Sequence, residues 1–230
     1  MRLVSQTTPP PVPGSLLGTT WGFHLSGSGD DMVGTILAGG KSRRFGRNKS
    51  IERFRGERLI ERQVRILRSL FPEVMIVTNA PELYLDLDVA IVQDIIPGLG
   101  PLGGIYTGLL FAKGESIFVT AVDMPFLQPG LIRRMMEVFP GHDVVVPRLG
   151  DYLEPLHGIY SPRCLAPVKR MLDREELQVV RFFPMVKMAY LDEEEIRRLD
   201  PEGLSFFNIN TPEDMAKAME ILARIMHETP

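Results

Sequence analysis

"MVGTILAGGKSRRFGRNKS" (Met32–Ser50) joins an apolar run to two glycines and then to a basic segment. The apolar run predicts a buried β-strand, and a strand followed by glycines commonly exposes backbone amides to a phosphate group. The basic segment carries Lys41, Arg43, Arg44, Arg47 and Lys49. Such a local cluster suits a small ligand with several negative charges, because phosphate makes strong charge-assisted contacts with Lys and Arg.

The overall composition argues against a polyanionic partner. The chain has 230 residues, a formal net charge of -3 and a pI near 5.9, so it offers no general positive field for nucleic acid. A hydrophobic content of 44% predicts one globular domain with a sizeable core. No apolar run reaches the roughly 18 residues of a membrane span. Cys164 is the only cysteine, which is compatible with a reducing cytoplasm. We therefore expect a soluble, cytoplasmic protein.

Residues 1–31 differ from the rest, because they are rich in Pro, Gly, Ser and Thr and show no sustained period. They lack the clean apolar segment and the cleavage site of a secretory signal. We interpret them as a flexible leader or a segment foreign to the native protein. Met32 would then be the natural start, and residues 32–230 would form a single domain.

From Val33 onward, β-rich runs alternate with helical ones, which predicts an α/β fold with a mostly parallel central sheet in a Rossmann-like, three-layer domain. The expected strands are 33–37, 74–78, 89–92, 116–122, 143–147, 156–160 and 205–210. The expected helices are one with an apolar face from Leu59 to Leu70, then 101–111, 129–139 and one after Thr211. For the last helix, Thr211 is the expected N-cap, Pro212 the first position and Asp214 the partner in a capping box.

Two common nucleotide-binding motifs are absent, since "LAGGKSRRFG" matches neither G-x-G-x-x-G nor the P-loop. Two glycines alone fit a tight turn flanked by solvated cations equally well. Asp123 is more specific, because it follows a long apolar strand at the position where open α/β sheets bind ligands. Its carboxylate is a hard oxygen ligand of the kind that Mg2+ prefers, although an Asp before Pro125 could also cap a turn.

Several ordered motifs resemble one family. "LAGGKSRRFGRNK", "TNAPELY", "VQDIIPGLGPLGGI", "VDMPF", "EPLHGIYS" and "NINTPEDM" are similar to motifs of nucleotidyltransferases with the nucleotide-diphospho-sugar transferase fold. Among these, the chain most resembles the molybdenum cofactor guanylyltransferases, from Met32 to Met226. The resemblance implies transfer of GMP from GTP to the phosphate of molybdopterin, with release of pyrophosphate. It also implies Mg2+ as cofactor.

Residue roles follow from the resemblance alone. It implies that Leu37, Ala38, Gly39 and Gly40 bind GTP through backbone groups, and that Lys49, Arg43 and Arg44 hold the triphosphate. It implies that Asn79 lies at the guanine and that Asp94 pairs with guanine nitrogens or with the ribose. Asp123 becomes the metal ligand, and Asn208 and Asn210 the contacts to the pterin or its phosphate. For Asn79 a turn before Pro81, and for Asp94 a loop carboxylate, are the structural alternatives.

Other functions stay open. A cytidylyltransferase for the same pterin, or another nucleotidyltransferase with a sugar-phosphate acceptor, would share the fold. Cytidylyl relatives tend to have "AAG" where this chain has "AGG" at 38–40, which favours guanylyl transfer. A third possibility is a non-catalytic GTP-binding protein of cofactor assembly. The expected partners are GTP, molybdopterin, other cofactor-assembly proteins and the molybdoenzyme that receives the cofactor, without nucleic acid or membrane.

Overall fold

The computed structural model describes residues 32–39, 53–54, 56–113 and 115–228. The expected leader (1–31) and most of the basic segment (40–52) lie outside the described residues, and with them Gly40, Arg43, Arg44 and Lys49. All other residues assigned to the site can be located.

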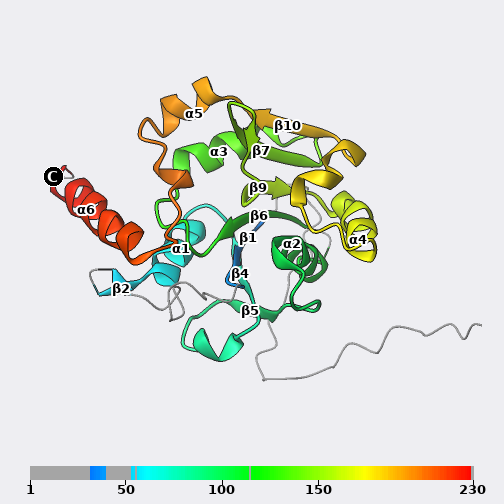
Figure 1. Ribbon diagram of the computed structural model, residues 1–230, viewed down its shortest axis with the longest axis horizontal. Helices are drawn as coiled ribbons and strands as arrows, with labels where there is room; N and C mark the ends of the chain where they lie inside the picture. The colour runs from blue at the N-terminus through cyan, green and yellow to red at the C-terminus, as the bar shows by residue number, and fades with distance from the viewer. Residues whose placement is uncertain (1–31, 40–52, 55, 114, 229–230) are drawn as a thin grey trace, which may run out of the picture.

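An eight-stranded sheet forms the centre of the molecule, in the order β10-β7-β9-β6-β1-β4-β5, with β8 paired to β7 (Figure 1). Pairs along this order are parallel except those made by β9, which is antiparallel to β6 and β7. The mostly parallel sheet is therefore confirmed. The strands are β1 (Met32–Leu37), β4 (Glu73–Thr78), β5 (Ala90–Gln93), β6 (Ser116–Ala121), β7 (Val144–Leu149), β8 (Tyr152–Leu153), β9 (His157–Tyr160) and β10 (Met188–Leu191).

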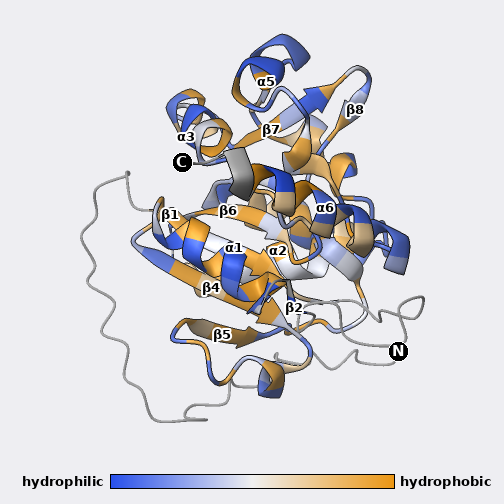
Figure 2. Ribbon diagram, turned by 90° about the vertical axis from the view of Figure 1, so that its left-hand side faces the viewer, coloured by the Kyte–Doolittle hydropathy of each residue, from blue (hydrophilic) through white to orange (hydrophobic). Residues whose placement is uncertain are grey.

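Helices cover both faces of the sheet, so the three-layer arrangement is also confirmed. Helices α2 (Gly100–Phe111) and α4 (Leu165–Asp173) pack on one face, and α1 (Leu59–Arg68) and α3 (Pro129–Val138) pack on the other. Successive residues of β1 alternate between the two cores: Val33 and Leu37 face α2, whereas Met32 and Ile36 face α1. The strands accordingly form an apolar band between the helix layers (Figure 2).

Glycines in α2 bring this helix close to the sheet. A Cβ on Gly104 would lie 3.0 Å from Leu37 Cδ2, and a Cβ on Gly108 would lie 3.1 Å from Ile117 Cδ1. Both distances are shorter than ordinary van der Waals contact. Tight packing therefore accounts for these two glycines without any ligand.

The last helix, α6 (Pro212–Glu228), begins as expected. Thr211 Oγ1 accepts a hydrogen bond from the Asp214 amide at 3.1 Å, and Asp214 Oδ2 accepts one from the Thr211 amide at 2.8 Å. This reciprocal pair is the expected capping box. Elements that were not expected include α4, β8, β10 and the short hairpin of β2 (Arg53–Phe54) and β3 (Glu57–Arg58).

The expected strand at 205–210 is wrong. Residues Leu204–Phe206 form a 3-10 helix, η5, and the chain then continues without a strand partner among the described residues. Gly203 has a φ of +66° and turns the chain there, while the Asp200 carboxylate accepts the amides of Leu204 at 3.0 Å and Ser205 at 2.7 Å. The apolar side chains still pack, because Phe207 contacts Phe126.

Candidate active site

Four parallel strands end side by side at one edge of the sheet. Leu37, the last residue of β1, pairs with Val77 of β4 on one side and with Ala121 of β6 on the other. Thr78 of β4 pairs with Gln93 of β5. The chain builds β4 and β5 on one side of β1 and then crosses to β6 on the other side, so the topology reverses between β1 and β6. Open α/β sheets bind ligands at such a reversal, outside the carboxyl ends of the strands.

The residues that follow β1 and β4 are held together by hydrogen bonds. The Ala38 amide donates to Val77 O at 2.9 Å, and Thr78 Oγ1 donates to Ala38 O at 3.0 Å. Gly39 and Asn79 come next and are both exposed, and a Cβ on Gly39 would lie 3.8 Å from Asn79 Nδ2. The structure therefore brings Gly39 and Asn79 next to each other at the edge of the sheet.

Leu37 contributes to this edge through its backbone only. Its side chain is buried against α2, while its carbonyl oxygen accepts the Val122 amide at 3.1 Å. That bond joins the end of β1 to the loop that carries Asp123. The role in GTP binding that the resemblance implies for the Leu37 backbone remains a prediction.

Asp94 lies directly after β5 and is buried. Its Oδ1 accepts hydrogen bonds from Thr107 Oγ1 at 2.9 Å and from the Ile96 amide at 3.2 Å, and its own amide donates to Thr78 O at 3.0 Å. The carboxylate thus ties the loop after β5 to α2. One oxygen already serves this structural role, so any contact with a guanine would use Oδ2.

Asp123 lies two residues beyond the end of β6, and its side chain is partly exposed. The Asp123 carbonyl accepts the amide of Ile209 at 2.9 Å. This bond brings Asn208 and Asn210, both exposed, to the loop that holds Asp123. Asn208 Nδ2 donates to Phe206 O at 3.1 Å, and the Asn210 amide donates to Asp214 Oδ2 at 2.9 Å.

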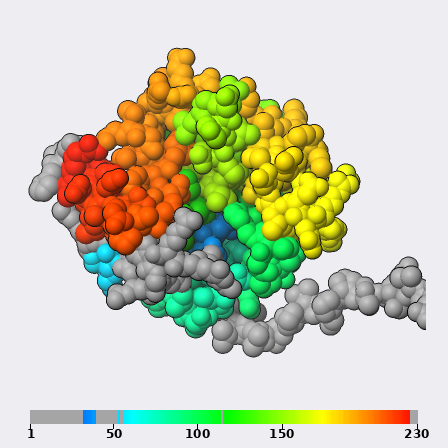
Figure 3. Space-filling view, viewed as in Figure 1, coloured from blue at the N-terminus to red at the C-terminus, as the bar shows by residue number. Residues whose placement is uncertain are grey.

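The space-filling view shows how these segments surround the end of β1 (Figure 3). The blue atoms of β1 lie recessed in the middle of this face, between green residues of α2 and the orange segment that leads to α6. This face therefore shows a hollow over β1, bordered by α2 and by the segment that leads to α6.

The described residues contain no group of three or more His, Cys, Asp or Glu side chains that could hold a metal. Mg2+ does not need one, since it is usually bound by one or two carboxylates and completes its shell with phosphate oxygens and water. The carboxylate of Asp123 at the strand ends fits that donor set.

His157 does not supply a proton-transfer group. It is fully buried at the start of β9, in edge contact with Phe118 and Phe206, and neither ring nitrogen has a partner among the described residues. Burial lowers the pKa of His157 to about 3, so the ring is neutral near pH 7.

Substitution of His157 should make the free energy of unfolding depend less on pH below pH 7. The pKa is about 3 in the folded protein and about 6.5 in the unfolded chain, so between these values only the unfolded state binds this proton. Stability is therefore lost as the pH falls through this window, with a slope approaching about 1.4 kcal/mol per pH unit. We expect His157→Met to remove that slope, measured by urea unfolding between pH 7 and pH 4.5. An unchanged slope would mean that His157 is protonated in the folded protein.

Sequence reasoning missed two residues at this edge. Gln63 is fully buried in α1 and donates to the loop that carries Asp123. The sequence feature that could have identified Gln63 is a polar residue on the apolar face of a predicted helix. Glu154 precedes β9, and because β9 runs antiparallel to β6, its start lies at the same edge. Burial raises the pKa of the Glu154 carboxyl.

Known proteins share both the sequence and the fold. The family model described as "MobA-like NTP transferase domain" matches residues 34–187. The chain is 42% identical over 186 residues to a probable molybdenum cofactor guanylyltransferase of Pelotomaculum thermopropionicum, which covers 81% of this chain and 91% of that protein. It is 36% identical over 191 residues to a molybdenum cofactor guanylyltransferase of Desulfosudis oleivorans, which covers 82% of this chain and 95% of that protein.

A solved structure agrees as well. The crystal structure of molybdopterin-guanine dinucleotide biosynthesis protein A from Archaeoglobus fulgidus superposes with a TM-score of 0.73 at 29% identity, and covers 84% of this chain and all of that one (100%). Within the described ranges, no helix is long and apolar enough to cross a membrane. The matches in sequence and structure extend over most of the chain and include the strand ends described above, and we conclude that it belongs to the MobA-like NTP transferase family, in the branch of the molybdenum cofactor guanylyltransferases.

Proposed function

We propose that this chain transfers GMP from GTP to the phosphate of molybdopterin. A phosphate oxygen of the acceptor forms a bond to the α-phosphorus of GTP. The bond between that phosphorus and the bridging oxygen breaks, and pyrophosphate leaves with the electron pair. The products are the guanine dinucleotide form of the cofactor and pyrophosphate. The observation that carries the proposal is that Gly39, Asn79 and Asp123 follow the ends of the neighbouring strands β1, β4 and β6, where the sheet reverses, in a chain of this family.

The nucleotide half of the site lies over β1, β4 and β5. We assign the backbone of Leu37, Ala38, Gly39 and Gly40 to GTP, Asn79 to the guanine, and the remaining carboxylate oxygen of Asp94 to guanine nitrogens or the ribose. An amide and a carboxylate match the donor and acceptor edge of guanine. Arg43 and Lys49, in the basic segment after the strand, would hold the triphosphate and the departing pyrophosphate.

Asp123 is the proposed Mg2+ ligand. A bound Mg2+ would supply charge stabilisation to the phosphate oxygens as negative charge redistributes. The chain itself contributes the position of the carboxylate, because the Val122 amide is bonded to Leu37 O at 3.1 Å and Asp123 O accepts the Ile209 amide at 2.9 Å. The same Ile209 bond supports Asn208 and Asn210 as contacts to the pterin or its phosphate.

The proposed reaction needs little proton transfer. A phosphate nucleophile is already ionised near neutral pH, so the protein has mainly to orient the two substrates and to neutralise charge. The burial of His157 agrees with this, since no base is required there. A cytoplasmic location is part of the proposal, as are contacts with other cofactor-assembly proteins and with the receiving molybdoenzyme.

Lys49→Ala should reduce turnover more than GTP affinity. The contact would strengthen as charge moves onto the leaving pyrophosphate, and a hydrogen bond to a charged group contributes about 1.5–3 kcal/mol. We therefore expect kcat to fall roughly tenfold or more, since about 1.4 kcal/mol is a factor of ten, with a smaller change in the Kd of GTP. Lys169→Ala is the control, because Lys169 pairs with Asp173 on the exposed side of α4. Equal turnover in the two variants would show that Lys49 is a solvated surface residue that takes no part in the reaction.

Pyrophosphate release tests the activity. The full chain is incubated with GTP, Mg2+ and molybdopterin, and pyrophosphate is measured with and without the acceptor. Acceptor-dependent release is expected. GTP binding with Mg2+ but without release would favour a non-catalytic protein of cofactor assembly.

A further inference from the structure

Four carbonyl groups in the loop 121–125 accept hydrogen bonds from other parts of the fold. Gln63 Nε2 donates to Ala121 O at 2.7 Å and to Met124 O at 2.8 Å. Arg62 Nε donates to Pro125 O at 3.0 Å. The Ile209 amide donates to Asp123 O at 2.9 Å. The loop is thus held from α1 on one side and from the segment before α6 on the other.

Gln63 makes the two bonds that bracket Asp123. Both of its partners are carbonyl oxygens, which can only accept, so the NH2 group must face them and both of its hydrogens are used. Gln63 is 0% exposed and lies in the apolar stripe of α1 beside Ile60, Val64 and Leu67. Burying an amide among apolar side chains is costly unless it is hydrogen-bonded. Its Oε1 has no partner among the described residues, so the two hydrogen bonds to carbonyl groups have to offset the cost of burying this amide.

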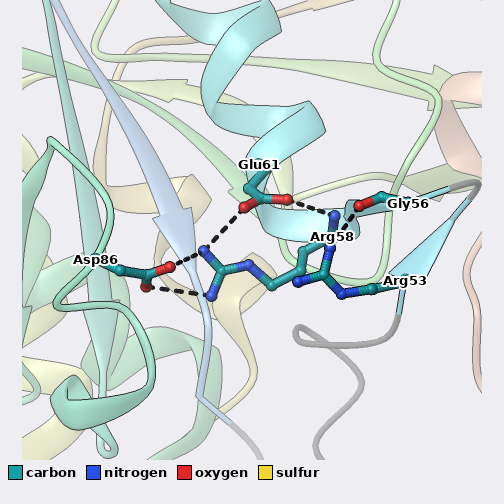
Figure 4. A network of polar contacts seen from close by, with 5 residues as sticks. All are labelled: Arg53, Gly56, Arg58, Glu61 and Asp86. Atoms are coloured by element: carbon teal, nitrogen blue, oxygen red, sulfur yellow. Dashed lines mark hydrogen bonds and ion pairs between the residues drawn. The ribbon is translucent and has the colours of Figure 1, made fainter.

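The helix that presents Gln63 is itself anchored at its start (Figure 4). The Glu61 carboxylate accepts the Arg58 amide at 2.6 Å, and the Arg58 guanidinium forms a two-pronged contact with Asp86 at 3.2 and 2.6 Å. Asp86 belongs to the loop between β4 and β5, so α1 is tied to the nucleotide side of the sheet. Its first turns therefore form a fixed support for the loop 121–125.

We propose that Gln63 is a positioning residue, which fixes the loop 121–125 so that the Asp123 carboxylate faces the metal and the nucleotide phosphates. The proposal rests on the proposed role of Asp123. Gln63 touches neither substrate nor metal and acts through the two backbone carbonyls. Residues that orient a metal ligand from outside the coordination shell typically change metal affinity or activity by about 10–100-fold when substituted.

The test compares Gln63→Met with wild type. Methionine keeps the length and volume of the side chain but cannot donate to Ala121 O or Met124 O. Val64→Ala is the matched control, because Val64 is the next residue of α1, is buried in the same core and has no side-chain group that could donate a hydrogen bond to the loop. Asp123→Asn is the reference for loss of the metal ligand. Affinity for Mn2+ in the presence of GTP is measured by electron paramagnetic resonance, and hydrogen exchange is measured at amides of the loop.

We expect Gln63→Met to weaken Mn2+ binding by roughly tenfold or more and to speed hydrogen exchange in the loop. GTP affinity without metal should stay unchanged, and a high Mg2+ concentration should restore much of the lost turnover. Val64→Ala should lower the melting temperature but keep wild-type Mn2+ affinity.

Three results would overturn the proposal. If Asp123→Asn weakens Mn2+ binding and Gln63→Met does not, Gln63 has no positioning role while the proposed function stands. If Val64→Ala weakens Mn2+ binding as much as Gln63→Met, the effect is one of general stability. If Asp123→Asn keeps wild-type affinity, the metal assignment fails first, and the positioning proposal fails with it because Gln63 then has no metal ligand to position.

Discussion

Asp123→Asn should lower the rate of guanylyl transfer by at least roughly a hundredfold and leave the protein folded. Asn has nearly the same shape and can still cap a turn, but it lacks the negative charge that would hold Mg2+ against the triphosphate. The backbone bonds of the loop, to Leu37 O and from the Ile209 amide, do not depend on the side chain. Folding and catalysis should therefore respond differently to this substitution.

Two measurements on the same preparation check this result. Thermal unfolding should give a melting temperature near that of wild type, and pyrophosphate release across a Mg2+ titration should give the loss of rate. If the variant reaches the wild-type rate at ordinary Mg2+ concentrations, Asp123 is a turn residue and has no part in the reaction.

The largest loss of stability is expected from Asp200→Ala. Asp200 is 2% exposed, and its two oxygens accept the buried amides of Leu204 and Ser205. Leaving a buried donor unpaired costs about 1–3 kcal/mol, so the two together should cost about 3 kcal/mol. For a domain of this size, the melting temperature should fall by roughly 6–12 °C.

Asp192→Ala is the matched control for Asp200. Asp192 also accepts a backbone amide, that of Glu195 at 2.9 Å, but it lies at the exposed start of α5 (Glu193–Leu199), where loss of an N-cap costs about 1 kcal/mol. The melting temperature of Asp200→Asn should lie between those of wild type and Asp200→Ala, because Asn keeps one acceptor oxygen. Equal melting temperatures for Asp200→Ala and Asp192→Ala would show that the two buried amides find other partners.

The sheet could be predicted from sequence because its strands are short apolar runs whose side chains are buried on both faces. The strand at 116–121 and the helix at 101–111 were located to within a residue at each end. The capping residues Thr211 and Asp214 also predicted the start of α6, since their contact is local. Local chemistry of this kind does not depend on the rest of the fold.

Long-range contacts limited the prediction elsewhere. The segment 207–210 alternates apolar and polar side chains like a strand, but the carboxylate of Asp200 and the positive φ of Gly203 impose a 3-10 turn just before it. The pairing of Gln63 with two carbonyl groups is similarly invisible in sequence, because it joins residues separated by 58 and 61 positions. Such contacts are set by how α1 packs on the sheet.

The positions of three candidate residues at one edge of the sheet could be predicted for a related reason. Parallel strands place their carboxyl ends at one edge, so Asn79, Asp94 and Asp123 could be expected to lie together. The second role of Asp94, as acceptor for Thr107 and the Ile96 amide, could not be predicted from sequence. Thr107 lies on a helix, and which side chains that helix turns toward Asp94 depends on its packing. The roles assigned to Asn79, Asp94 and Asp123 remain predictions, as do those of Lys49 and Arg43, which lie outside the described ranges.

The most direct test of the proposed activity is a comparison of GTP, CTP and ATP as substrates with molybdopterin and Mg2+. The rate of acceptor-dependent pyrophosphate release is measured for each nucleotide with the full chain. A site whose polar groups match guanine should prefer GTP in kcat/KM by at least roughly a hundredfold, since the wrong base would leave them unpaired. A preference for CTP would contradict guanylyl transfer while leaving the fold and family unaffected, and no release with any of the three would contradict catalysis itself.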